Sequence, residues 1–188
     1  MNRTDFGRLF TGLVDPVLWL ATSAHDGKRG GLIATFVTNA SLAPEEPRVV
    51  IGIAKHHFTW ELVDRSKAFC LHLVDQTRSE WVRRFGLATG RDQDKFAGLN
   101  PTQAANGCPL FTGEIFWAEC TVEASFDTGD RSLFLGQVTN CGKGGDGLPL
   151  KMSEMLKSLT DEDRKENEQR LNRDIAIDMA AIREWRRR

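Results

Sequence analysis

Residues 114–139, EIFWAECTVEASFDTGDRSLFLGQVT, carry the clearest structural signal in the sequence. Between residues 116 and 126 apolar side chains alternate with mostly polar ones, which is the period of a strand with one buried face. The alternating apolar positions are Phe116, Ala118, Cys120, Val122, Ala124 and Phe126. Turn-forming residues follow at 127–130, and residues 132–139 become apolar again. The stretch predicts an antiparallel β-hairpin.

Four further strands are expected upstream, at residues 17–21, 31–37, 49–53 and 68–74, with Asp26-Gly27 as a hairpin turn between the first two. Short helices are expected at residues 59–65 and 77–86, and residues 87–113 read as a long irregular loop. A parallel sheet would need a crossover of about a dozen residues, usually a helix, between most strands. Such helices are missing, so we expect a mainly β fold with α additions, built as an antiparallel barrel.

The two ends of the chain differ from this body. A helix is expected over residues 6–14, with Thr4 as its N-cap and Pro16 closing it. Residues 148–188 hold 10 basic and 9 acidic residues in 41 positions, and helices are expected at 151–159 and 161–185, the second capped by Thr160. A narrow apolar stripe runs along the second helix, formed by Leu171, Ile175, Met179, Ile182 and Trp185.

The length of 188 residues therefore divides into a domain at 1–147 and a charged helical extension at 148–188. We expect the stripe of the extension to pack on the barrel or on a dimer partner. A net charge of −1 argues against nucleic acid as a partner. No apolar run approaches the roughly 20 residues that span a bilayer, so no membrane partner is expected. The absence of an apolar stretch near residue 1 and of any CxxC pair predicts a reduced, cytoplasmic protein.

Three segments have the composition of a binding site. Residues 34–41, ATFVTNAS, leave a predicted strand and offer hydroxyls, an amide and backbone N–H groups. A flat heterocycle with donors and acceptors along its edge needs such groups. The alternative is a strand-to-loop transition in which Thr35, Thr38, Asn39 and Ser41 only satisfy the turn.

The second segment is Lys55-His56-His57-Phe58-Thr59, which follows a strand and opens a short helix. Backbone N–H groups and the helix dipole would act together with Lys55 in holding a phosphate. A metal site at His56 and His57 is not expected, because adjacent residues of an extended chain point apart and no third ligand lies at helical spacing.

The third segment is residues 129–138, GDRSLFLGQV, in which Arg131 would emerge at the rim of the barrel and could contact an anionic ligand. An ordinary hairpin with a surface arginine is the alternative. The remaining histidines, His25 in a turn and His72 inside a strand, are interpreted as surface and structural residues.

In this order the segments resemble the flavin reductase-like proteins, a family with an FMN-binding split β-barrel. The resemblance rests on GLIATFVTNASL (31–42), PRVVIGIAKHHFTWELV (47–63), RRFG (83–86) with DKF (94–96), and GDRSLFLGQV (129–138). It implies an antiparallel split β-barrel of the FMN-binding type, with N- and C-terminal helices added.

The resemblance also implies the cofactor contacts, with residues 35–41 along the flavin and residues 55–59 at its phosphate. The cofactor-binding residues predicted in this way are Thr35, Phe36, Thr38, Asn39, Ala40, Ser41, Lys55, His56, Phe58 and Thr59. Arg131 stands where the family motif most often has histidine, near the flavin and the nicotinamide, and is the candidate catalytic residue. Because an arginine does not release its proton near neutral pH, we expect it to pair with a phosphate or an acidic substrate.

The implied activity is hydride transfer from NADH or NADPH to FMN, and then electron delivery to free flavin or another acceptor. The resemblance further implies a homodimer with the flavin site at the subunit interface, with Trp81, Lys95 and Phe96 facing the partner's flavin. A flavin-dependent monooxygenase is an expected acceptor. Two alternatives are a flavoredoxin-like electron carrier that does not oxidise nicotinamide, and a non-redox module that binds a flavin or another ligand.

Overall fold

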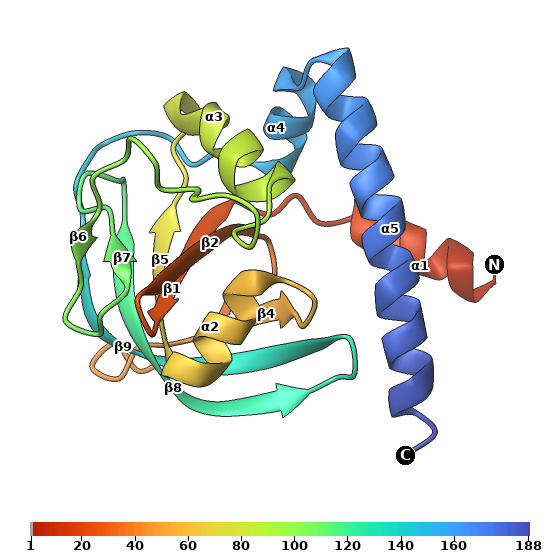
Figure 1. Ribbon diagram of the computed structural model, residues 1–188, viewed down its shortest axis with the longest axis horizontal. Helices are drawn as coiled ribbons and strands as arrows, with labels where there is room; N and C mark the ends of the chain where they lie inside the picture. The colour runs from red at the N-terminus through yellow and green to blue at the C-terminus, as the bar shows by residue number, and fades with distance from the viewer. Residues whose placement is uncertain (1) are drawn as a thin grey trace.

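The computed structural model describes residues 2–188, apart from the side chain of Arg8. Its centre is a seven-stranded antiparallel sheet in the order β2-β1-β5-β8-β9-β4-β3 (Figure 1). The strands are β1 (Trp19–His25), β2 (Lys28–Ala34), β3 (Val37–Asn39), β4 (Arg48–Ala54), β5 (Ala68–Leu73), β8 (Trp117–Asp127) and β9 (Arg131–Gly142). The short strands β6 (Thr102–Gln103) and β7 (Pro109–Leu110) pair separately in the expected loop region. The mainly β, antiparallel prediction is confirmed.

The sheet is curled into a barrel, and the connection from β2 to β3 shows why. These two strands form opposite edges of the sheet, yet only Thr35 and Phe36 separate them in the chain. Three Cα–Cα steps reach at most about 11 Å, so the two edges must lie close together. The single strand expected at 31–37 is therefore two strands, divided where the chain passes from one edge to the other.

The two predicted hairpins form, but the second extends beyond the barrel. Asp26 and Gly27 both have positive φ, and His25 pairs with Lys28, which is the geometry of a two-residue hairpin turn. In the β8–β9 hairpin the register shifts twice along β8, and such bulges bend a strand. Ala118 and Cys120 are buried, whereas Phe126 is 62% exposed. The alternation in the sequence therefore marks a buried face only along the first half of β8.

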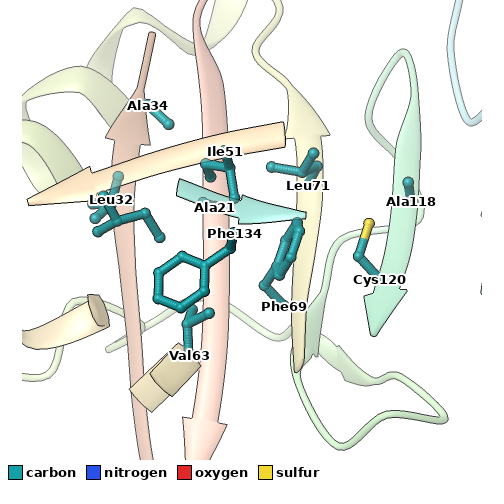
Figure 2. Close-up of a cluster of buried hydrophobic side chains, with 11 residues drawn as sticks. Ala21, Leu32, Ala34, Ile51, Val63, Phe69, Leu71, Ala118, Cys120 and Phe134 are labelled. Carbon is teal, nitrogen blue, oxygen red and sulfur yellow. The ribbon is translucent and has the colours of Figure 1, made fainter. Parts of the chain in front are cut away.

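The barrel interior is filled by apolar side chains from every long strand and from α2 (Phe58–Ser66), as Figure 2 shows. Phe69 and Phe134 are its largest members, and neither has exposed area. Gly136 makes room for one of these rings, because a Cβ at that position would lie 2.6 Å from Cζ of Phe69. Such close packing is typical of protein cores.

A second core lies between the barrel and its helical cover, which consists of η1 (Gln76–Arg78), α3 (Ser79–Trp81), the π-helical turn η2 (Val82–Leu87) and α4 (Met152–Ser158). Trp81 and Phe96 are buried there, and the ammonium group of Lys95 donates to the carbonyl oxygens of Gly31 and Phe85 at 3.0 and 2.9 Å. The chain's own core encloses Trp81 and Phe96, so the expectation that these two face a partner's flavin is wrong. Lys95 lines a cavity, and its expected role stays a prediction.

The two terminal helices are α1 (Arg3–Gly12) and α5 (Asp161–Trp185). The N-cap of α1 is Asn2, not Thr4, because the side chains of Asn2 and Asp5 form a reciprocal capping box. Thr160 caps α5 as expected, since its hydroxyl accepts from the backbone N–H of Asp163. Figure 1 shows α5 running alongside the barrel, with the tip of the β8–β9 hairpin near its last turn. Within residues 2–188, none of the helices combines the length and apolar character needed to cross a membrane.

Candidate functional site

The side of α5 that lies against the barrel is mostly polar. Its half-buried or buried residues recur mainly every three or four positions, which is one helical face. They are Asp163, Asn167, Arg170, Asp174, Asp178, Ala181 and Ile182. The apolar residues Leu171, Ile175 and Met179 lie on another face and are about half exposed. The helix therefore contacts its own barrel through charged groups and leaves much of its apolar stripe in the solvent.

Arg131 is the centre of this contact. It begins β9, and its guanidinium group donates to Asp130 of its own hairpin at 2.6 Å and to Asp178 of α5 at 2.7 Å. The centre of the guanidinium group also lies 4.7 Å from the ring centre of Phe36, within the range of a cation–π contact. Two carboxylates and an aromatic face thus fix the orientation of Arg131, and the residue joins the 34–41 segment to α5.

The other residues expected at a phosphate also have carboxylate neighbours. The imidazole of His56 lies between Asp174, at 3.3 Å, and Asp178, at 3.5 Å, and the ammonium group of Lys55 lies 2.6 Å from Asp127. Burial raises the pKa of Asp178, although the nearby Arg131 acts in the opposite direction. Lys55, the cation that the sequence assigns to a phosphate, is therefore already paired with a carboxylate within the chain.

A cavity of about 850 Å³ lies beside this contact, between the start of α2, the turn η2 with the following loop, and α5. His56, Phe58 and Thr59 line it, together with Arg170 and Asp174 from α5. Lys55 does not line it. Among the predicted cofactor-binding residues, the cavity thus brings together those at the start of α2.

The N-terminus of α2 opens on this cavity. Its N-cap residue is His57, whose side chain makes no capping hydrogen bond, so the first-turn N–H groups have no side-chain acceptor. Thr59 is only 3% exposed and lines the cavity. The buried side-chain atoms without a hydrogen-bond partner at this point of the described chain are the two ring nitrogens of His56, which also lines the cavity. A buried polar group in this condition is costly unless a ligand or water satisfies it.

Basic groups surround the same point. Burial, and then the neighbouring His56 and Arg170, lower the pKa of His57 to about 3, so its imidazole is neutral at neutral pH. Burial and Arg170 likewise lower the pKa of Lys95 to about 8. The positive charge of Arg170 thus acts on both groups, which lie beside the start of α2.

Among the described residues, His56, His57 and Asp174 form a cluster that could ligate a metal ion. One ligand atom from each of them lies within 4.8 Å of the other two. The centres of the two imidazole rings are 4.3 Å apart, so the expectation that adjacent histidines point apart is wrong here. The turn before α2 places both rings on one side. Arg131 and Arg170 lie beside the cluster, and these cations disfavour a metal ion.

The 34–41 segment lies at the edge strand β3. Thr38, Asn39 and Ala40 are exposed, and Phe36 packs with its Cβ over Gly52. The side-chain oxygens of Asn39 and Ser41 accept from the backbone N–H groups of Ser41 and Ala43. These two residues thus satisfy a local turn, as the alternative interpretation proposed, while Thr35 and Thr38 make no such bond within residues 2–188.

Sequence reasoning missed the contribution of α5. Arg170, Asp174 and Asp178 recur at i, i+4 and i+8, and this polar stripe was available as a signal. The apolar stripe beside it instead predicts an apolar packing face, because an apolar helix face is the one that usually packs.

The curled antiparallel sheet, with a cavity beside it, places the protein in the class of split β-barrels. Comparison with known proteins gives the family. The sequence model of the flavin reductase like domain matches residues 10–154, and the chain belongs to this flavin reductase-like family. The helix α5 lies outside the matched residues.

Individual relatives agree with this assignment. The chain is 30% identical over 148 residues to the flavin-dependent monooxygenase reductase subunit HsaB of Rhodococcus jostii, covering 79% of this chain and 71% of that protein. It is 28% identical over 113 residues to a flavin reductase of Pseudomonas putida, covering 60% and 64% of the two chains. An NADH:FAD oxidoreductase of Streptomyces globisporus has the same fold, with a TM-score of 0.70, 19% identity, and coverage of 80% and 90%.

Proposed function

We propose that this protein is an FMN-binding flavin reductase that oxidises NADH or NADPH and passes the electrons to free flavin or another acceptor. The family match and the relatives named as flavin reductases support the reductase activity. The choice of FMN and of a nicotinamide co-substrate rests on the resemblance of residues 31–63 and 129–138 to the family motifs.

The residues at the start of α2 fit the phosphate of a flavin nucleotide. The observation that carries this proposal is the N-terminus of α2, which has no side-chain cap and opens on the cavity beside His56, whose buried ring nitrogens have no hydrogen-bond partner among the described residues. Helix N-termini bind phosphate through backbone N–H groups and the helix dipole. A volume of about 850 Å³ falls within the roughly 300–1,000 Å³ range of ligand pockets. We assign Lys55, His56, Phe58 and Thr59 to this end, and Thr35 to Ser41 to the flavin ring and ribityl chain.

The protein's part in the reaction is binding and orientation. Bound FMN would supply the redox chemistry, as the hydride acceptor. Arg131 is held by Asp130 and Asp178, and as an arginine it does not donate a proton near neutral pH. In this proposal it positions Phe36, whose ring centre lies 4.7 Å from the guanidinium group. Hydride transfer needs no general base from the chain.

We further propose that a flavin-dependent monooxygenase is the partner protein that uses the electrons, since several relatives are named as reductase subunits of such enzymes.

A homodimer is proposed on separate grounds. The helix α1 exposes an apolar face with Phe6, Leu9 and Phe10, and Leu13 and Val14 directly after the helix are exposed as well. The helix α5 exposes part of its apolar stripe. Exposed apolar patches of this kind mark association surfaces. Sedimentation at several concentrations tests the dimer, and a monomer at all of them would contradict it.

Anaerobic reduction of the FMN-loaded protein tests the activity. Mixing with NADH or NADPH should bleach the flavin's long-wavelength absorbance within the time of a stopped-flow measurement. An Arg131→His variant, run beside the wild type, reports whether the departure from the family motif changes the rate. A protein that retains FMN and stays oxidised with both nucleotides would instead be a flavoredoxin-like carrier. A protein that retains no FMN after gel filtration would contradict the proposal altogether.

A further inference from the structure

The cations expected to bind a phosphate are engaged elsewhere. Lys55 is paired with Asp127, and Arg131 with Asp130 and Asp178. The imidazole of His56 faces Asp174 and Asp178. A phosphate entering the cavity at the start of α2 would have to displace these carboxylates, unless another cation is available to it.

Arg170 is that cation. It is half-buried on the polar face of α5 and lines the cavity opposite the start of α2. Its nearest carboxylate is Asp174, at 3.9 Å from the guanidinium Nε, which is beyond hydrogen-bonding distance. Asp174 is also close to His56. The donors of Arg170 are therefore free to bind a ligand in the cavity.

We propose that Arg170 of α5 binds a phosphate group of a nucleotide, together with the N-terminus of α2 and the hydroxyl of Thr59. The proposal rests on the flavin reductase function proposed above, and it assigns a role to a helix outside the residues matched by the family. A guanidinium group forms two parallel hydrogen bonds with a phosphate. Such a pair would also place a cation opposite the α2 N-terminus, so that the anion lies between them.

The surroundings of Arg170 support an anion. Its charge contributes to the lowered pKa values of His57 and Lys95, which shows that it lies among other basic groups. Asp92 and Glu166 also line the cavity. Arg91, from the loop after η2, also lines the cavity, but it forms an ion pair with Glu61 and donates to the carbonyl oxygen of His56. Arg173, an exposed arginine of α5, also lines the cavity. Arg170 is the half-buried arginine of this lining, and its nearest carboxylate is beyond hydrogen-bonding distance.

The first experiment compares FMN with riboflavin, which lacks the phosphate, by fluorescence titration. The wild type should bind FMN more tightly than riboflavin. In an Arg170→Gln variant this advantage should fall by about 10-fold or more, as expected for a charge-assisted hydrogen bond, while the affinity for riboflavin stays the same. An Arg170→Lys variant should retain part of the advantage. Arg164→Gln is the matched control, since it removes an exposed arginine of α5 outside the cavity.

The second experiment asks whether the phosphate belongs to the nicotinamide nucleotide. Binding of NADP⁺ and NAD⁺ to the FMN-loaded variants is measured in the same way, without turnover. A change in the ratio of the affinities for FMN and riboflavin assigns the phosphate to the flavin. A change in the ratio of the affinities for NADP⁺ and NAD⁺ assigns it to the nicotinamide nucleotide. If neither ratio changes in Arg170→Gln while the wild type binds FMN, the role of Arg170 is overturned and the reductase proposal stands. If the wild type binds no flavin, both proposals fail.

Discussion

The barrel interior and the contact between the barrel and α5 differ in the polarity of their side chains. The interior is apolar throughout, with Phe69 and Phe134 at its centre. The α5 contact is mainly polar, with Arg131, His56, Asp174 and Asp178 in its middle, and it becomes apolar only near its end, at Ile182 and Trp185. One region is stabilised by removing apolar area from water, and the other by charge pairing between partly exposed groups.

This difference implies that the two regions respond to different perturbations. Burial of apolar area is nearly insensitive to salt, whereas partly exposed ion pairs are screened by it. Each pair at the surface also contributes little stability by itself. We therefore expect the barrel to set the global stability and α5 to open locally at lower cost, and the following predictions separate the two.

The largest effect is expected from a cavity in the barrel core. Phe134→Ala removes a ring with no exposed area and should lower the free energy of unfolding by about 3–5 kcal/mol. Phe126→Ala, on the same hairpin but 62% exposed, is the control and should cost much less. Urea denaturation of the apoprotein measures both. Equal losses would show that the end of β8 is buried in solution, contrary to the structure.

Acid should affect both regions through one buried histidine each. Burial lowers the pKa of His72 to about 4, against 6.5 in the unfolded chain, and lowers that of His57 to about 3. Each contribution is complete above pH 6.5 and is lost as the pH falls towards the folded value. Between about pH 6 and 4.5 each histidine should reduce the free energy of unfolding by about 1.4 kcal/mol per pH unit.

Variants separate these two contributions. His72 accepts from the N–H of Phe111 and donates to the carbonyl oxygen of Leu20. Glutamine does not titrate, so His72→Gln should lower the slope of the unfolding free energy against pH by the contribution of one proton. Truncation after Leu159 exposes His57 and should remove the contribution of the second proton. His25→Gln, in the exposed turn, should leave the slope unchanged. A slope that survives both changes would mean that other groups titrate in this range.

A smaller effect is expected from the α5 contact itself. Asp178→Asn removes the carboxylate between Arg131 and His56 and should destabilise the docked helix by about 1–2 kcal/mol. The readout is faster proteolysis within residues 161–185, with little change in the unfolding of the barrel. Glu184→Gln removes an acidic group from an exposed i,i+4 pair on the same helix and serves as the control. The same rate of cleavage in both variants would argue against the Arg131–Asp178 contact.

Salt should give the smallest effect. Raising NaCl from 0.05 to 0.5 M shortens the Debye length to about 4 Å, which should weaken α5 docking by about 0.5–1 kcal/mol. Hydrogen exchange should then speed up in the amides of α5, while the amides of β5 and β9 keep their protection. Uniform acceleration in both regions would show that the helix and the barrel open together.

The strands and hairpins were predictable because their signals are local. Asp26-Gly27 specifies a turn whose positive φ values few other residues adopt, and the alternation from residue 116 specifies a strand. Thr160 likewise identified the start of α5. The positions of Trp81, Lys95 and Phe96 were not predictable, because their burial depends on other elements of the fold. The ammonium group of Lys95, for example, donates to Gly31, which lies 64 positions away along the chain.

The candidate site divides in the same way. Residues 55–59 are recognisable in the sequence as a strand-to-helix turn with anion-binding composition, and residues 31–63 and 129–138 resemble one family. The partners of Arg131 and His56 are not recognisable, because Asp174 and Asp178 lie more than 40 residues away and belong to a helix whose apolar stripe predicts a different packing face.

The sequence alone thus determined the antiparallel barrel, its hairpins, the family resemblance and the helical extension. Each of these depends on periodicity, on turn chemistry or on short motifs. Only the tertiary structure decided which face of α5 contacts the barrel, which basic groups are paired with carboxylates, and that Arg170 lines the cavity. The physical reason is that an ion pair or a cavity wall depends on where separate elements meet, and neither leaves a periodic signal in any one of them.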